Sequence, residues 1–356
     1  MKKIGILTFH KTLNYGAVLQ AYALKTIIQS FNVSCDIINY TYPALNKNFR
    51  IFNKLHFRYK NVINNIFFVP KLKNLFRKFI NDFLVDMKSI KKKDLIFLND
   101  IYDIFITGSD QVWNGEVTEH DNSFLLDFVK DSNKINSYAA SFGVTQLTDT
   151  DIKNYPKLLN RFKNISVREQ QGIEIIKFLI GREDVVKTLD PTFLLTIDQW
   201  KKLINKETTR QDTVVMYLMG KNLDLISFAK KLAKDKNCKL IILRNTPRKY
   251  DKTIENIFVT PEQWLEYIYN AKYVVTNSFH GLAFSIIFNK TFFTGFVSTN
   301  NRNSRLENLL NLTNLRNRLI DNIENNYDKS IDWDSVNKII DKERKKSLDY
   351  LKKIIN

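Results

Sequence analysis

The chain has 356 residues, of which 44% are hydrophobic and 26% charged, as in a soluble globular protein long enough for two domains. Its two cysteines, Cys35 and Cys238, fit neither a disulfide framework nor a metal-binding pattern, which favours a reducing, cytoplasmic environment. No apolar run approaches the roughly 20 residues needed to span a bilayer, so any membrane contact is expected to be peripheral and on the inner face.

Positive charge is concentrated in one stretch. Residues 47–93 hold thirteen Lys or Arg against two acidic residues, which is +11 of the formal net charge of +18. Phenylalanine and tyrosine alternate with these cations, and we expect a basic helical insertion over residues 46–99. Such a segment suits peripheral contact with an anionic membrane, and a merely solvated insertion is the alternative. Nucleic-acid binding is not expected, because no recognised motif accompanies the charge.

The first part of the chain shows an α/β rhythm. A short apolar run at 3–9, a helical pattern at 14–31 and a second apolar run at 35–40 predict a βαβ unit with parallel strands. After the insertion, strands are predicted at 103–108, 135–141, 164–169 and 185–193, with a helix at 170–181. We therefore expect a Rossmann-like N-terminal domain over residues 1–196.

A second α/β series follows a polar segment at 196–212. Strands are predicted at 213–219, 239–244, 272–278 and 291–296, and helices at 223–237, 261–271 and 281–289. This predicts a second Rossmann-like domain over residues 212–330, followed by an amphipathic helix at 331–356 that packs back across the domains. In such α/β folds, ligands bind beyond the carboxyl ends of the strands, so the residues there are the candidates for a site.

The loop after the first strand carries Asn14, Tyr15 and Gly16. A glycine lets the backbone approach a ligand closely, and the helix that starts here presents free N–H groups to an anion. A glycine retained for packing is the alternative explanation.

The loop after the strand at 103–108 carries Ser109, Asp110, Gln111 and Trp113. A carboxylate, an amide and a flat aromatic ring together suit a sugar, since polar groups bind the hydroxyls and the ring stacks on the C–H face. The alternative makes the polar residues helix caps and Trp113 a core residue.

Two further loops carry charged side chains. Arg168, at the end of a strand, is costly to bury unpaired and so faces either an ion-pair partner or a bound carboxylate or phosphate. Arg302 and Arg305 precede an amphipathic helix and could add to an anion site, or lie in solvent. Asp190 precedes Pro191, and here a rigid structural turn is favoured.

The segment "VVTNSFHGLAFSIIF" (274–288) places Asn277, Ser278 and His280 where a buried strand gives way to a buried helix. The helix dipole disfavours a charged imidazole there unless a bound anion offsets it. A partly exposed His280 whose proton affinity depends on an incoming anion would make a general acid. A histidine satisfied within the core is the alternative.

Taken together, these segments resemble the polysaccharide pyruvyl transferase family. The similarity rests on "NYGAVLQAYAL", "TGSDQVWN", "SYAASFG", "SVREQQG", "LDPTFLL" and "TNSFHGLAFSIIFNK", which follow in that order along most of the chain. The resemblance implies a two-domain fold like that of the glycosyltransferase B class. It also implies an enzyme that transfers the enolpyruvyl portion of phosphoenolpyruvate to a sugar, forming a cyclic pyruvate ketal on a bacterial surface glycan.

By the same resemblance, the family's catalytic histidine falls on His280 and its phosphoenolpyruvate-binding arginine on Arg168. A second family arginine, two residues before the histidine, is replaced by Ser278. Either Arg305 or Arg302 is then expected to supply the missing cation, or the donor is held differently.

The expected reaction delivers a proton from His280 to the vinyl carbon while a sugar hydroxyl attacks, with Asp110 as candidate base. No cofactor or metal is expected beyond the donor substrate. The acceptor is expected to be a sugar, carried by a lipid-linked oligosaccharide in exopolysaccharide or capsule assembly. Because Ser278 replaces an arginine, a glycosyltransferase that uses a nucleotide sugar remains the alternative.

Overall fold

The first part of the chain forms a parallel sheet around β1. The computed structural model describes residues 1–43, 70–204, 212–246, 249–296, 303–323 and 327–356. The strand order of this sheet is β2-β1-β3-β4, and isolated bridges continue it into the smaller pair β5-β6. The strands are β1 (Lys3–Leu7), β2 (Ser34–Ile37), β3 (Ile104–Thr107), β4 (Ile135–Ser137), β5 (Ser166–Val167) and β6 (Val186–Lys187).

Helix α1 (Tyr15–Gln29) connects β1 to β2 and is buried along most of its length. It begins at Asn14, whose side chain accepts hydrogen bonds from the backbone N–H groups of Gly16 and Ala17, as an N-cap does. The other helices of this part are α4 (Gly115–Thr118), α5 (Asp149–Leu159) and α6 (Gln170–Ile180), with short 3₁₀ turns η2 (Lys92–Asp100), η3 (Asn122–Leu125), η4 (Ser132–Lys134) and η5 (Pro191–Phe193).

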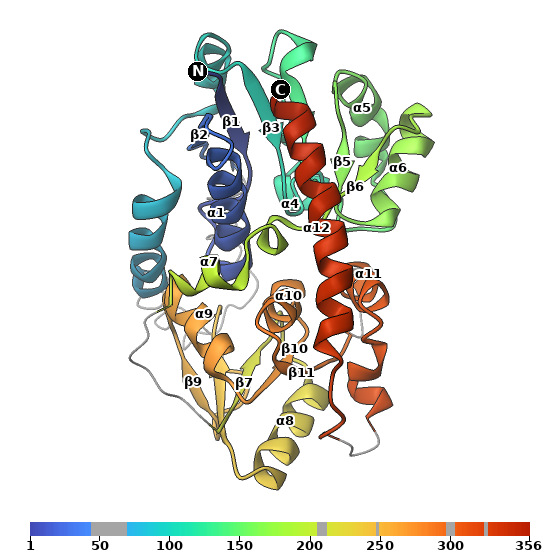
Figure 1. Cartoon of the computed structure of the whole chain (residues 1–356). Helices are drawn as coiled ribbons and strands as arrows, with labels where there is room; N and C mark the ends of the chain where they lie inside the picture. The colour runs from blue at the N-terminus through green and yellow to red at the C-terminus, as the bar shows by residue number, and fades with distance from the viewer. Residues whose placement is uncertain (44–69, 205–211, 247–248, 297–302, 324–326) are drawn as a thin grey trace.

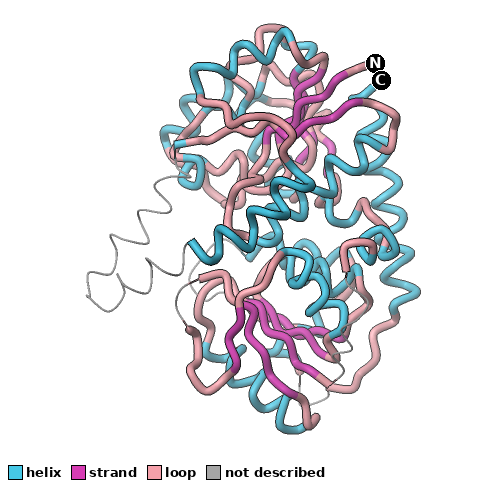
Figure 2. The backbone as a smooth tube through the Cα atoms, turned by 90° about the vertical axis from the view of Figure 1, so that its left-hand side faces the viewer, coloured by secondary structure: helices cyan, strands magenta, loops and turns pink. Residues whose placement is uncertain are grey.

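The second part of the chain forms its own parallel sheet, with strand order β11-β10-β7-β8-β9. Figure 2 shows the strands gathered in two groups, one in each half of the molecule. The strands are β7 (Thr213–Tyr217), β8 (Lys239–Leu243), β9 (Glu255–Ile257), β10 (Tyr273–Thr276) and β11 (Thr291–Thr294). The helices are α7 (Ile197–Lys201), α8 (Leu223–Asp235), α9 (Pro261–Asn270), α10 (Phe279–Ile287) and α11 (Ser304–Leu312), followed by the turns η7 (Arg316–Arg318) and η8 (Ile320–Asn322).

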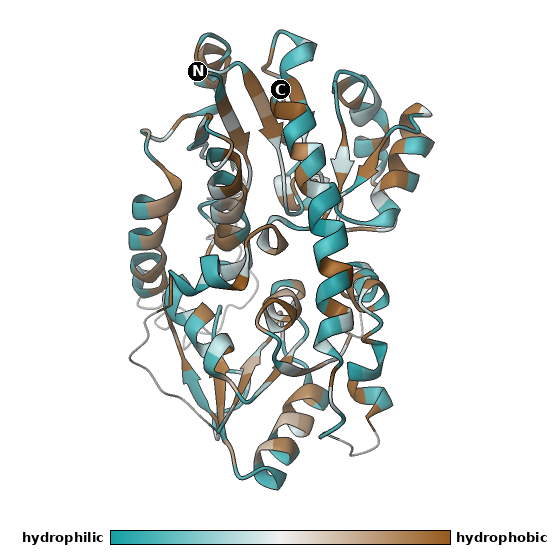
Figure 3. Ribbon diagram, in the orientation of Figure 1, coloured by the Kyte–Doolittle hydropathy of each residue, from teal (hydrophilic) through white to brown (hydrophobic). Residues whose placement is uncertain are grey.

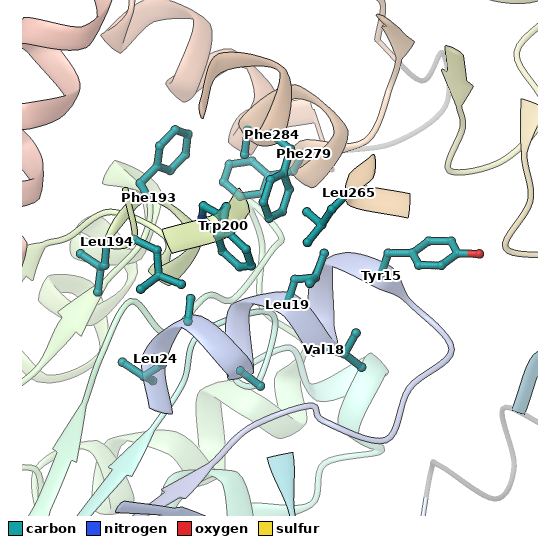
Figure 4. Close-up of a cluster of buried hydrophobic side chains, with 14 of the residues drawn as sticks. Tyr15, Val18, Leu19, Leu24, Phe193, Leu194, Trp200, Leu265, Phe279 and Phe284 are labelled. Carbon is teal, nitrogen blue, oxygen red and sulfur yellow. The ribbon is translucent and has the colours of Figure 1, made fainter. Parts of the chain in front are cut away.

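One hydrophobic cluster joins the two sheets. Figure 4 shows side chains from α1, from the 193–200 segment and from α9 and α10 packed together, and all of them belong to one buried cluster. Tyr15 anchors this contact, because its ring stacks on Trp264 and its hydroxyl donates to the carbonyls of Arg244 and Val259. The two halves therefore meet through an apolar interface, which brings the first turn of α1 close to α10.

The C-terminal helix α12 (Trp333–Ile355) crosses from the second half to the first (Figure 1). The hydroxyl of Tyr350 donates to the carbonyl of Ser137 at 2.9 Å, and Lys2 Nζ donates to the carbonyl of Ile355 at 2.9 Å. Figure 3 shows β1 and β3 largely hydrophobic, whereas α12 carries hydrophilic residues over much of its length. No helix in the described ranges combines the length and the apolar character needed to cross a membrane.

The α/β class and the two Rossmann-like units are confirmed, and α12 packs back as predicted. Sequence reasoning missed α5 and β9, and the strand predicted at 185–193 is only the two residues of β6. The domain limits of 1–196, 212–330 and 331–356 stay predictions. Residues 46–69 of the predicted basic insertion lie outside the described residues. Residues 70–79 are helical and continue into η1 (Ile80–Leu84), a π-helical turn.

Candidate functional site

A small pocket lies where the carboxyl ends of the first sheet face α10 and α11. Its cavity volume is about 50 Å³, which is small for a ligand pocket. Both halves of the molecule and α12 contribute to the wall. The lining residues are Arg168, Glu169, Lys187, Thr188, Leu189, Asp190, Phe193, Phe279, Arg305, Asn308, Leu309, Leu312 and Glu343.

Asp190 lies at the centre of the charged part of this pocket. Its Oδ1 accepts hydrogen bonds from the backbone N–H of Thr192 at 3.0 Å and from the Thr192 hydroxyl at 2.8 Å. Its Oδ2 accepts from Arg168 Nη1 at 2.6 Å and from Ser109 Oγ at 3.3 Å, and lies 3.6 Å from His280 Nε2. The prediction that Asp190 only shapes a turn is therefore incomplete, because its carboxylate joins three residues of the candidate site.

The pKa of Asp190 lies well below its ordinary value. Burial alone would raise it, since the side chain is completely buried, but the neighbouring His280 and Arg168 outweigh that effect. Asp190 is therefore a fixed negative charge at neutral pH.

Arg168 is buried among three carboxylates, those of Asp190, Asp110 and Glu169. Burial opposes its charge, but these carboxylates raise the pKa of the Arg168 guanidinium above its ordinary value. The distances to Asp110 and Glu169 are 3.6 and 3.7 Å, too long for hydrogen bonds. Its Nε and Nη2 atoms are consequently buried without a hydrogen-bond acceptor, and both can receive an oxygen of a ligand.

Loop geometry brings Ser109 and Asp110 to this arginine. The preceding residue, Gly108, has φ 115°, and a Cβ there would lie 2.3 Å from the carbonyl oxygen of Tyr138. Only glycine fits so close to the neighbouring backbone, and the chain can then turn sharply after β3.

Arg305, on the first turn of α11, approaches the same pocket from the second half. Its Nη1 lies 3.8 Å from Asp110 Oδ1, and the amide of Gln111 lies beside it, where the amide oxygen accepts from the guanidinium once the amide is turned over. Burial and repulsion from Arg168 lower the pKa of Arg305 to about 10. The ring of Phe279 lies near both guanidiniums, with its centre 4.7 Å from that of Arg168 and 6.0 Å from that of Arg305.

His280 occupies the first turn of α10, behind the N-cap residue Ser278. The expectation of a partly exposed ring is wrong, because His280 is only 6% exposed. Its Nε2 nevertheless has no hydrogen-bond partner and is directed at Asp190. The ring packs so tightly on Gly16 that a Cβ at position 16 would lie 1.9 Å from Nδ1. Gly16 is thus required by the imidazole, which explains its place in the first loop.

Four of the sequence-predicted site residues have structural tasks. Asn14 caps α1, and Tyr15 bridges the two halves. Asn277 accepts a hydrogen bond from the Met219 N–H at 2.7 Å, outside the set of residues that line the pocket. Trp113 cannot stack on a sugar here, because it is fully buried and packs against core aromatic rings.

The remaining predicted residues divide into two groups. Of the predicted residues, Arg168 and Arg305 line the pocket itself. His280, Asp110, Ser109, Gln111 and Gly16 lie behind that lining, in contact with one another or with its charged side chains, and Ser278 caps the helix that carries His280. Arg302 lies outside the described residues.

Sequence reasoning missed three residues of the pocket: Asp190 as a charged partner, Glu169 and Phe279. Glu169 and Phe279 could have been found from their positions in the sequence. Glu169 directly follows Arg168, and Phe279 directly precedes His280. The sequence predicted a positively charged cleft. In the structure, three buried carboxylates lie beside the two guanidiniums, so the positive charge of the arginines is largely offset. Within the described ranges, no three side chains of the metal-ligating types gather as a metal site requires.

Several solved structures have a similar architecture. UDP-GlcNAc 2-epimerase from Methanocaldococcus jannaschii is 13% identical, with a TM-score of 0.49, over 96% of this chain and 92% of that chain. MurG from Acinetobacter baumannii is 9% identical, with a TM-score of 0.42, over 99% and 100% of the two chains. UGT89C1 from Arabidopsis thaliana is 8% identical, with a TM-score of 0.49, over 99% of each chain.

The fold is of the glycosyltransferase B type, with two Rossmann-like units of parallel sheet and a C-terminal helix that crosses back. No curated protein matches the sequence significantly. The model of one protein family, polysaccharide pyruvyl transferase, matches residues 14–298, which is most of the chain and includes Arg168, Asp190 and His280. The chain therefore belongs to the polysaccharide pyruvyl transferase family and is a transferase.

Proposed function

We propose that the protein transfers a pyruvyl group from phosphoenolpyruvate to a sugar of a bacterial surface polysaccharide or its lipid-linked precursor, with release of phosphate. The observation that supports this most is a set of buried donors without acceptors in one pocket. These are Nε and Nη2 of Arg168 and Nε of Arg305, beside the unpartnered Nε2 of His280. Buried donors of this kind are rare unless a ligand completes them.

Arg305 supplies the positive charge of the family arginine that is replaced by Ser278 in this chain. It comes from α11 and lines the same pocket as Arg168, so the two guanidiniums can bind one small acid together. The depressed pKa of Arg305 supports this role, because an anion would relieve both its burial and its repulsion from Arg168. Since the two arginines belong to different halves of the molecule, a small separation of the halves would admit the donor.

In the proposed reaction His280 delivers a proton to the vinyl carbon of phosphoenolpyruvate, while a sugar hydroxyl forms a bond to the adjacent carbon. The C–O bond to phosphate then breaks, and a second hydroxyl of the sugar closes the ketal at the same carbon. Asp110 is the candidate base for the hydroxyl protons, because its carboxylate lies between the two arginines, 3.6 and 3.8 Å from their nitrogens.

The acceptor and its location complete the proposal. A lipid-linked oligosaccharide is met at the inner face of the cell membrane, and the basic stretch 47–93 suits peripheral contact with anionic headgroups there. In the described part of that stretch, Lys88, Lys91 and Lys93 are exposed.

The test is incubation with phosphoenolpyruvate and candidate lipid-linked glycans, with phosphate release and the ketal methyl signal as readouts. His280→Ala and Arg168→Ala should each lose most of the activity. The matched controls, His120→Ala and Arg182→Ala, change the same residue types outside the pocket and should retain it. Thermal stabilisation by a nucleoside diphosphate, with none by phosphoenolpyruvate, would instead indicate a nucleotide-sugar glycosyltransferase and overturn the proposal.

A further inference from the structure

We propose that the carboxyl edge of the second sheet binds a neutral sugar, through the side-chain amides of Asn277 and Asn245 beneath Met219. The inference rests on the proposed function, since it gives the acceptor sugar of that reaction a place. Ligands of parallel α/β sheets bind beyond the carboxyl ends of the strands. Asn277 directly follows β10, while Met219 and Asn245 lie two residues after β7 and β8. These strands are neighbours in the order β10-β7-β8, and none of the three residues lines the charged pocket.

The side-chain amide of Asn277 is hydrogen-bonded at one end only. Its Oδ1 accepts from the backbone N–H of Met219 at 2.7 Å, and this bond fixes which end of the amide is the oxygen. Asn277 is only 4% exposed, and its Nδ2 is buried without a hydrogen-bond acceptor among the described residues. A buried donor in this state is costly, and an oxygen of a ligand would satisfy it.

Asn245 offers the complementary group from the other side of β7. Its Nδ2 lies 3.3 Å from the sulfur of Met219 and 3.5 Å from the hydroxyl of Tyr217. Its Oδ1 is buried and accepts no hydrogen bond from the described residues. The two amides therefore lack one acceptor and one donor, and both are neutral. A sugar hydroxyl accepts and donates at once, so the hydroxyls of one sugar can complete both amides without any change of charge.

Met219 covers the two amides and can give way to a ligand. Its side chain is exposed, at 41%, and it contacts Asn245 through the sulfur. A thioether is a weak hydrogen-bond acceptor on a flexible side chain. A sugar hydroxyl is the stronger partner for an amide, so we expect the sugar to displace the methionine side chain.

The chain connects this sugar site to the charged pocket. Phe279, which lines the pocket, and His280 follow Asn277 within three residues. Three residues of chain span at most about 10 Å, so a sugar held by Asn277 stays close to a donor bound in the pocket. An uncharged acceptor and an anionic donor would thus bind at adjacent places of different character.

The test measures sugar binding without turnover. The probes are the methyl glycosides of galactose, glucose, mannose and N-acetylglucosamine at millimolar concentration, and saturation-transfer NMR detects which of them binds. Asn245→Leu keeps the size of a partly exposed side chain and removes its amide, and Asn277→Ala removes the buried donor. Each should weaken binding of the best glycoside at least about tenfold. Met219→Ala removes the cover alone and should bind that glycoside at least as tightly as the wild type.

The matched control is Asn160→Leu, which replaces an exposed asparagine at the end of α5 and should bind the glycoside as the wild type does. Circular dichroism checks that each variant is folded, and Asn245→Leu alone decides the matter if Asn277→Ala is not. Undiminished binding by folded Asn245→Leu would overturn the proposal, and so would a wild type that binds uridine diphosphate but none of the glycosides, or no probe at all. A failure of the proposed function is recognised separately, as glycoside binding by a wild type that releases no phosphate from phosphoenolpyruvate.

Discussion

Replacing Gly16 with alanine should disable His280 without changing any charged group. The new Cβ would lie 1.9 Å from Nδ1 and 2.1 Å from Cγ of the imidazole. Carbon and nitrogen atoms normally pack about 3.5 Å apart, so the ring has to withdraw by about 1.5 Å. Misplacement of a reacting group by about 1 Å can reduce a rate about 100-fold, and we expect a loss of that order in kcat.

The same substitution should destabilise the fold by about 1–3 kcal/mol, as overpacking does. Gly16 has no left-handed backbone angle, and alanine is the better helix former by roughly 0.5–1 kcal/mol. In a His280→Ala background, where the ring is gone, Gly16→Ala should therefore be neutral or stabilising. Urea unfolding of the four proteins measures this coupling, and phosphate release measures kcat. A single Gly16→Ala variant with wild-type stability and turnover would refute the packing of this ring on α1.

Three further predictions concern the interface, the donor site and pH. Tyr15→Phe removes a hydroxyl that bridges the two halves and should lower the free energy of unfolding by about 1–3 kcal/mol in urea titrations, with kcat unchanged once the protein is folded. Arg305→Met keeps the length of the side chain but removes the charge, and should raise the Kd for phosphoenolpyruvate at least tenfold by calorimetry; an unchanged Kd would exclude Arg305 from the donor site. Because the folded-state pKa of Asp190 lies below its unfolded value, its contribution to stability is complete above about pH 5 and is lost as the pH falls through and below 4. The stability difference between the wild type and Asp190→Asn should accordingly shrink on acidification, and a difference that stays constant from pH 7 to pH 3 would contradict the assignment.

The fold could be predicted from local patterns because each strand and helix carries its own periodicity. The strands around β1 and β7 are short apolar runs that end in polar loops, and such runs define a parallel α/β sheet without knowledge of distant contacts. The position of His280 was predictable for the same reason, since a histidine at a strand-to-helix junction is a local feature.

Partners across the two halves could not be predicted in this way. Asp190 precedes a proline, and its local pattern is fully explained by capping the turn to Thr192. Its contact with His280 depends on how the second half docks on the first, and its contact with Arg168 on the pairing of β5 with β6, and no local pattern records either. For Trp113 the error is the reverse, because a structural residue was assigned to a ligand site. The polar residues around it in the sequence suggested sugar binding, whereas its ring is buried in the core.

The central claim is that His280 protonates the vinyl carbon of phosphoenolpyruvate as the ketal forms. Running the reaction in deuterated water with the acceptor glycan measures this most directly, by mass spectrometry and NMR of the product methyl group. The account predicts release of phosphate and a methyl group that carries one deuterium, with neither formed by His280→Ala. A product that keeps the vinyl group, or deuterated product made at the wild-type rate by His280→Ala, would contradict it.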